Sequence, residues 1–239
     1  MKIRIKFAKE GAMKFIGHLD IMRYFQKVMR RADVDIRYSE GFSPPQVMSF
    51  AAPLGVGLES RGEYVDIEVL TTDSSKEMLR RINDAMVEGM EALSYKLLPD
   101  TAANAMSIVA AADYTVRFRE AYEPEDWEGF AAGMKAFLEQ EQILVLKKTK
   151  KGEKEVNIRP MIYSLCVDSE PERQIRMQIS TGSAANLKPD AVIRAYMESL
   201  GEAMADFALM VTRTEVYAEK EDAGQKILCP LEAFGEDIE

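Results

Sequence analysis

Residues 2–7 read KIRIKF, in which a cation and an apolar residue alternate at every position. This two-residue period is typical of a β-strand that packs one face on a core and leaves the other face in water. The face expected in water carries Lys2, Arg4 and Lys6. We therefore predict that the chain begins with a half-buried strand whose exposed face is cationic.

An amphipathic helix is predicted to follow this strand and to end before Asp33. Its apolar residues recur at spacings of three and four, so they form one stripe that faces the core. The stripe consists of Leu19, Met22, Phe25, Met29 and Ala32. After it we predict a loop over 41–62 that contains a short strand at 47–52, a strand over 65–69, a helix that starts at Ser74 or Ser75, and a strand around 93–97.

The first half thus runs strand, helix, strand, strand, helix, strand, which is the order of the ferredoxin-like split βαβ unit. The second half nearly repeats this order, with one additional strand near Val156. We predict an α+β protein of two tandem ferredoxin-like domains with antiparallel sheets, at residues 1–100 and 113–231. Residues 101–112 are predicted to be a linker, and residues 232–239 a frayed acidic tail.

Composition limits the chemistry that the chain can perform. A single histidine, His18, and two separated cysteines cannot supply a Cys/His zinc site or an iron–sulfur cluster, and no phosphate-binding glycine motif is present. We therefore predict no metal and no cofactor. No apolar run approaches the roughly 20 residues of a membrane span, and the few cysteines suit a reducing compartment, so the sequence favours a cytoplasmic protein without a membrane partner.

Charge is distributed unevenly along the chain. The net charge is −9, yet residues 1–45 carry +5 and the remainder −14. Cations recur at one-turn intervals on the first helix, opposite its apolar stripe, and a second cluster lies at a predicted hairpin in the second half. Clustered cations bind phosphates by replacing counterions, although a solvated surface is the simpler alternative. The nucleic-acid-binding candidates are Arg4, Arg23, Lys27, Arg30, Arg31, Arg37, Lys147, Lys148, Lys150, Lys151 and Arg159.

The only histidine lies at the predicted start of the first helix. The positive end of the helix dipole favours a neutral imidazole, so His18 could act as a general base. RNA cleavage without a metal would also need a cation, such as Lys14 or Arg23, and an acid, such as Tyr24. The alternative is a structural role, in which His18 caps the helix or bonds Asp20.

Three segments resemble the radical-SAM-linked protein family, also called domain of unknown function 2344. They are FIGHLDIMR at 15–23, YSEGFSP at 38–44 and PLGVGLES at 53–60, and shorter agreements occur at 157–160, 187–189 and 213–217. The chain departs from the family pattern at Asn157 and at the Ser-Pro-Pro of 43–45. The resemblance implies association with a cobalamin-binding radical SAM protein and assigns no reaction. Tandem ferredoxin-like halves are also similar in architecture to CRISPR RNA-processing proteins.

These features favour three functions, and among them a non-enzymatic role leads. The first is an accessory RNA-binding module that acts with a radical SAM enzyme in tRNA- or rRNA-related metabolism. The second is a protein-interaction scaffold for that partner, and the third is an endoribonuclease that uses His18 without a metal. The candidates for contacts of the loop with a partner are Gly41, Phe42, Gly55, Gly57 and Glu59.

Overall fold

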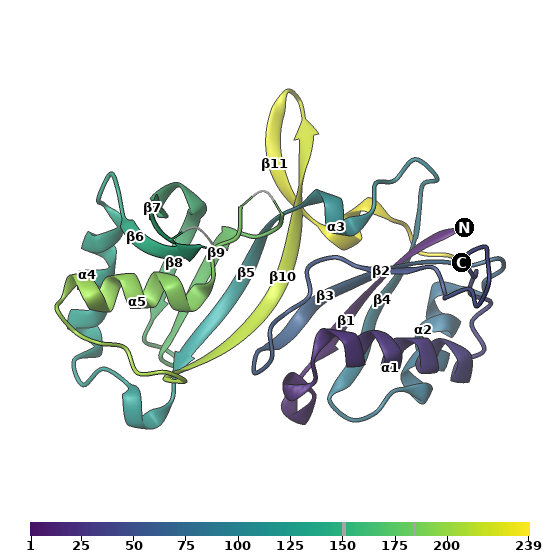
Figure 1. Ribbon diagram of the computed structural model, residues 1–239, viewed down its shortest axis with the longest axis horizontal. Helices are drawn as coiled ribbons and strands as arrows, with labels where there is room; N and C mark the ends of the chain where they lie inside the picture. The colour runs from purple at the N-terminus through teal and green to yellow at the C-terminus, as the bar shows by residue number, and fades with distance from the viewer. Residues whose placement is uncertain (150–151, 184) are drawn as a thin grey trace. The chain divides into compact units, whose positions relative to one another are not determined.

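The computed structural model describes residues 1–149, 152–183 and 185–239. It confirms the predicted α+β class, with 29% of the residues in helices and 38% in strands that pair mostly antiparallel. The chain divides into two compact units (Figure 1), unit 1 with residues 1–110 and 213–239 and unit 2 with residues 111–212. This division places residues 213–231 with the N-terminal half, whereas the sequence analysis assigned them to the second domain.

In unit 1 two long helices cover one face of a sheet. Its elements are β1 (Lys2–Lys9), the 3-10 turn η1 (Gly11–Phe15), α1 (His18–Arg31), β2 (Met48–Phe50), β3 (Glu59–Glu68), α2 (Ser75–Ala85) and β4 (Met90–Leu98). β1 lies between β3 and β4 and is antiparallel to both, and β2 pairs with the other edge of β3. Both helices share one apolar core with these strands, so they cover the same face of the sheet.

The alternation in β1 predicts the burial of one face of the strand correctly and that of the other face wrongly. Ile3, Ile5 and Phe7 are at most 1% exposed, as expected for the face toward the helices. The opposite face was predicted to be in water, and this prediction is wrong, because Arg4 is fully buried. Its guanidinium donates to both oxygens of Asp66, at 2.7 and 2.9 Å, and to the backbone oxygen of Leu231 at 3.0 Å.

The covering segments come from residues 101–112 and from the end of the chain. Ala103 accepts a hydrogen bond from Arg4 at 3.3 Å, and the amide of Ala105 donates to Asp66 at 2.8 Å. The predicted linker is therefore bound to unit 1, where it forms α3 (Ala105–Ile108) and begins β5 (Val109–Phe118). The Lys6 ammonium is likewise neutralised, by Glu215 at 2.6 Å and Glu232 at 2.8 Å.

The C-terminal residues are ordered on unit 1 and not frayed as predicted. They follow the hairpin of β10 (Leu209–Asp222) and β11 (Gln225–Pro230) and include the 3-10 turn η4 (Leu231–Phe234). Leu97 and Glu236 exchange backbone hydrogen bonds at 2.8 and 2.9 Å. The amide of Ser75 donates to the backbone oxygen of Ile238, and the amide of Ile238 donates to the Ser75 hydroxyl, both at 2.9 Å. β10 also pairs with β3, and Gly62 permits this, since a Cβ there would lie 2.7 Å from Cα of Glu215. These hydrogen bonds thus hold the C-terminal residues on unit 1 although they are acidic.

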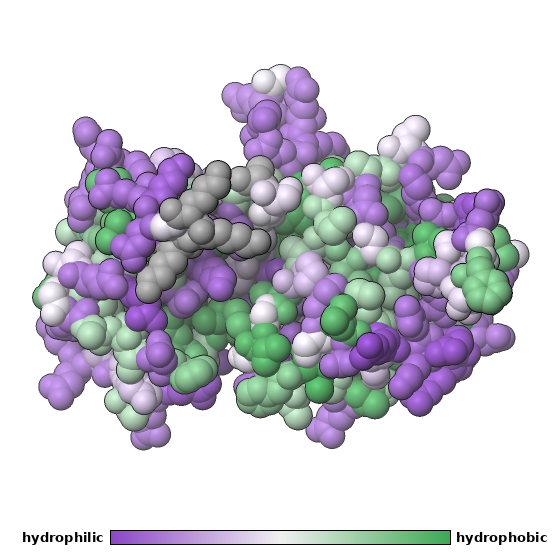
Figure 2. All heavy atoms as spheres, in the orientation of Figure 1, coloured by the Kyte–Doolittle hydropathy of each residue, from purple (hydrophilic) through white to green (hydrophobic). Residues whose placement is uncertain are grey.

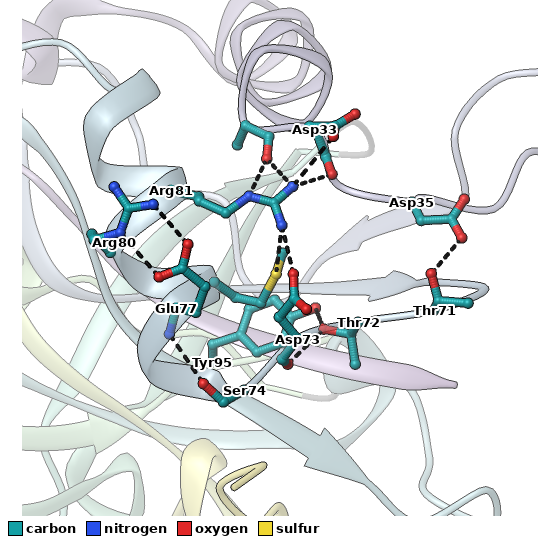
Figure 3. A network of polar contacts seen from close by, with 12 residues as sticks. Asp33, Asp35, Thr71, Thr72, Asp73, Ser74, Glu77, Arg80, Arg81 and Tyr95 are labelled. Atoms are coloured by element: carbon teal, nitrogen blue, oxygen red, sulfur yellow. Dashed lines mark hydrogen bonds and ion pairs between the residues drawn. The ribbon is translucent and has the colours of Figure 1, made fainter.

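Both ends of α1 and the start of α2 agree with the sequence prediction. α1 ends at Arg31, and the turn after it is held by Arg81 of α2, which donates to the backbone oxygens of Ala32 and Asp33 and to the carboxylate of Asp73 (Figure 3). α2 begins after Ser74, whose hydroxyl accepts from the amide of Glu77 at 3.4 Å. The capping-box spacing of Ser74 and Glu77 therefore predicted the start of α2 correctly.

Unit 2 pairs β9 with both β5 and β8 in an antiparallel sheet. Its aromatic core includes Trp127 stacked on Phe130, with the ring of Tyr196 at its edge. The predicted basic hairpin forms a separate two-stranded sheet, β6 with β7. The elements are η2 (Glu120–Tyr122), α4 (Trp127–Leu138), β6 (Leu144–Thr149), β7 (Gly152–Asn157), η3 (Arg159–Met161), β8 (Ile162–Asp168), β9 (Gln174–Ser180) and α5 (Pro189–Ser199).

Within the described residues, no helix is long and apolar enough to cross a membrane.

The Arg4–Asp66 pair should dominate the stability of unit 1. We expect Asp66→Ala to lower the free energy of unfolding by about 3–5 kcal/mol, because it leaves a buried guanidinium without its counterion. Glu68→Ala, two positions along the same strand, removes the half-exposed pair with Arg37 and should cost less than about 1 kcal/mol. Urea unfolding of both variants measures the difference, and equal costs would contradict this account.

Candidate functional site

A shallow pocket lies at the start of α1 in unit 1, and its space of about 250 Å³ includes open solvent, so it encloses little more than one water molecule. Its apolar lining comes from β1, α1, β2 and the loop before β3: Phe7, Ile21, Phe50, Pro53 and Leu54. Three polar side chains join them, namely Lys9, His18 and Glu63. The site therefore combines ionisable groups with an otherwise hydrophobic enclosure.

Two charged residues of the pocket, Lys9 and Glu63, lie at strand positions where the alternation predicts an apolar residue facing the core. Glu63 lies directly opposite Phe7 in the β1–β3 ladder, and it shares its face with Val65 and Ile67 because side chains alternate along a strand. It is 4% exposed. Lys9 follows a register shift after Phe7 and is 3% exposed. Both charges are thus placed among apolar neighbours.

Pairing of these buried charges is incomplete. Arg213, which is 2% exposed, brings Nη2 within 3.0 Å of Oε2 of Glu63. Oε1 of Glu63 and Nε and Nη2 of Arg213 nevertheless have no hydrogen bond to any described residue. Lys9 makes neither a hydrogen bond nor an ion pair within the described parts of the chain, and burial lowers the pKa of its ammonium. Such groups are costly to bury unpaired.

His18 is the first residue of α1, and its imidazole packs edge-on against Phe50 with ring centroids 5.3 Å apart. Gly17 precedes it at the N-cap and offers no side chain to the helix terminus. The His18 side chain makes no hydrogen bond to another described residue, and Asp20 instead pairs with Arg23 at 3.1 Å. The capping role considered for His18 is therefore absent from this arrangement.

The other residues considered for RNA cleavage do not line the pocket. Lys14 pairs with Glu59 at 2.9 Å, and the hydroxyl of Tyr24 accepts from the amide of Val87 at 2.9 Å. Burial raises the pKa of Tyr24 above its ordinary value. The ionisable residues that line the pocket with His18 are Lys9 and Glu63, and not the predicted Lys14 and Tyr24.

A family profile described as "Uncharacterized protein conserved in bacteria (DUF2344)" matches residues 2–189. The chain belongs to this family. No curated protein matches it. The matched region of this DUF2344 protein includes Lys9, His18 and Glu63 and ends before Arg213. The segments at 15–23 and 53–60 that carry the resemblance both contribute residues to the pocket.

The cations predicted to bind nucleic acid have different environments in the DUF2344 chain. Arg4 is buried in its ion pair with Asp66, and Arg37 donates a hydrogen bond to the carboxylate of Glu68 at 2.9 Å. Four cations of α1 are exposed and are called the basic face of α1 below: Arg23, Lys27, Arg30 and Arg31. Figure 2 shows hydrophobic residues around the start of α1 and hydrophilic residues along the remainder of the helix.

In unit 2 the predicted basic cluster is only partly described. Lys147 is exposed on β6. Arg159 holds the backbone, since it donates to the oxygens of Leu138 at 2.7 Å and Ile162 at 3.1 Å. Lys150 and Lys151 lie outside the described residues, as does the side chain of Lys148.

The loop candidates separate into two groups. Gly57 adopts φ +90° and donates its amide to the backbone oxygen of Lys14 at 2.8 Å, and Glu59 pairs with the Lys14 ammonium, so Gly57 and Glu59 are tied to η1, whereas Gly55 follows the pocket residue Leu54. Phe42, by contrast, is fully exposed after Gly41, which has φ +113°. Within the described chain no cluster of three His, Cys, Asp or Glu side chains could hold a metal ion.

Two substitutions should separate structural from functional charge in the pocket. Arg213→Met should lower the free energy of unfolding by about 3–5 kcal/mol, because it leaves Glu63 buried without a partner. Lys9→Met should be neutral or stabilising, because the lysine loses no partner and its desolvation cost disappears. Chemical denaturation measures both. A large destabilisation by Lys9→Met would show that the lysine is a structural counterion.

Proposed function

We propose that this protein is a cytoplasmic accessory protein that binds RNA through the basic face of α1. The observation that carries this proposal is the pairing state of these cations. Among the described residues, Lys27, Arg30 and Arg31 have no carboxylate partner, whereas Arg4, Lys6 and Arg213 are all neutralised. Exposed, unpaired cations bind phosphates with a gain from counterion release.

The spacing of these cations suits a strand with several phosphates. Arg23, Lys27 and Arg31 recur every four residues, so they form one line along the outer side of α1. At 1.5 Å of rise per residue the line is about 12 Å long. A nucleic acid strand that follows it would meet a cation at each helical turn.

The resemblance supports two finer parts of the proposal. We propose a radical SAM protein as the partner and tRNA- or rRNA-related metabolism as the setting. We also propose that each half is a split βαβ unit. The strand order β4-β1-β3-β2 in unit 1 supports this assignment, as does β9 between β5 and β8 in unit 2, where the β6–β7 hairpin is the additional element.

A scaffold function is the second candidate, and Phe42 is the observation that favours it. Its side chain is fully exposed at the tip of a loop that also places Gly41 and Ser43 at positive φ. An exposed aromatic residue of this kind is a frequent anchor in protein interfaces. Cleavage by His18 is not proposed, because Lys14 and Tyr24 are engaged away from the pocket.

Charge reversal on α1 tests RNA binding. We expect Lys27→Glu with Arg31→Glu to weaken binding of a transfer RNA by more than tenfold at low salt and to reduce the slope of log K against log salt by about 2, since two phosphate contacts are lost. Lys76→Glu with Lys135→Glu changes the net charge equally at exposed positions elsewhere and should have little effect. Equal losses in both variants, or no salt-sensitive binding by the unmodified protein, would contradict the proposal.

The scaffold candidate predicts a different sensitivity. We expect a complex with the radical SAM partner to survive high salt and nuclease treatment, and Phe42→Asp to abolish it by placing a charge in an apolar contact. Co-purification with the tagged partner measures this. Tyr122→Asp, at another exposed aromatic residue, is the matched control, and equal retention of both variants would exclude Phe42 as the anchor.

A further inference from the structure

The loop between α1 and β2 lies against the helix. At its base Tyr38 and Gln46 form an antiparallel bridge, and the amide of Ser39 donates to the backbone oxygen of Pro45 at 2.9 Å. The side chain of Gln46, a residue that is 8% exposed, donates through Nε2 to the backbone oxygen of Gln26 in α1 at 3.3 Å. The base of this loop is therefore tied to the middle of the helix.

One cation of the basic face of α1 meets the loop at the same carbonyl group. The Arg30 guanidinium donates through Nε to the backbone oxygen of Gln26 at 3.2 Å, so this oxygen accepts from both Arg30 and Gln46. Arg30 is exposed, and within the described parts of the chain its guanidinium forms no ion pair. The loop thus joins the basic face on the side where Arg30 lies.

Tyr38 places an aromatic ring at this junction. Its hydroxyl accepts a hydrogen bond at 3.4 Å from Nε2 of Gln46, the nitrogen that also donates to Gln26. The residue nevertheless remains 47% exposed. A tyrosine side chain has few torsions, and one restrained at its hydroxyl loses little conformational entropy when a flat group stacks on it. Tyr38 therefore offers a flat apolar surface that hydrogen bonds connect to a cation of α1.

We propose that the loop and α1 together bind single-stranded RNA, with a nucleobase stacked on Tyr38 and the adjoining phosphates on the basic face of α1. This inference rests on the proposed function, to which it adds the class of RNA. Proteins that bind single strands combine a basic track for the backbone with aromatic side chains for the bases, whatever their sequence. A duplex keeps its bases paired and stacked on one another, so it has none to place on the ring. Tyr38 is thus the residue that selects unpaired RNA.

Fluorescence anisotropy with one short RNA, used alone and annealed to its complement, tests this selection. The unmodified protein should bind the single strand more tightly than the duplex. We expect Tyr38→Ala to weaken binding of the single strand by about 5- to 150-fold, the usual effect of removing a ring that stacks on a base, and to leave binding of the duplex unchanged. Tyr38→Phe keeps the ring and should retain most of the affinity. Tyr122→Ala removes a tyrosine of unit 2 that is also 47% exposed and should have no effect.

The salt dependence of binding separates stacking from a structural role of the ring. A stacked ring touches no phosphate, so Tyr38→Ala should leave the slope of log K against log salt unchanged, whereas Lys27→Glu with Arg31→Glu lowers it. A lower slope for Tyr38→Ala would mean that the ring only holds cations in place, and it would overturn the inference. So would salt-sensitive binding that is equal for strand and duplex or insensitive to Tyr38→Ala, although the proposed function would then stand. No salt-sensitive binding of either RNA form would overturn both.

Discussion

Unit 1 depends on the buried guanidinium of Arg4. It lies in the strand at the middle of the sheet and binds Asp66 of β3, Ala103 after β4 and Leu231 near the C-terminus. One side chain thus joins the sheet to the two segments that cover its second face. A buried guanidinium requires such partners, since its desolvation is compensated only when its donors are satisfied. The same contacts help to fix residues 101–105 and 231–239 on unit 1, where Ala105 and Leu231 are fully buried and Ile238 packs against the core.

This covering changes where the molecule can offer positive charge. Arg4 and Lys6 belong to the alternating stretch at the start of the sequence, and both form ion pairs that hold the fold. In the described part of unit 1, three cations that stay exposed without a carboxylate partner, Lys27, Arg30 and Arg31, lie together on α1, whose opposite side packs on the core, while Lys76 and Lys220 lie on other elements. The basic face of α1 and the pocket at its first residue are therefore adjacent features of one helix.

The sequence pattern of β1 and β3 already marks Lys9 and Glu63 as unusual. Lys9 continues the inward row of Ile3, Ile5 and Phe7, and Glu63 begins the inward row of Val65 and Ile67. A charged residue in phase with a core row is a signal that sequence carries, and it indicates either the end of a strand or a functional site. Which of these it is depends on neighbours from other segments. Arg213, 150 positions beyond Glu63 in the chain, could not be assigned to the same cluster from spacing.

The sequence by itself determined the α+β class, both ends of α1, the start of α2 and membership of the DUF2344 family. Periodicity and capping act over a few residues, so they can be read without knowledge of the fold. Only the tertiary structure decided that Arg4 is buried, that the acidic tail is ordered and that Lys9, His18 and Glu63 share a pocket. These outcomes depend on which segments cover a face, and the segments that bury Arg4 are 99 and 227 positions away from it. Desolvation and charge pairing act between residues that are close in space but distant in sequence, so a local sequence pattern cannot predict them.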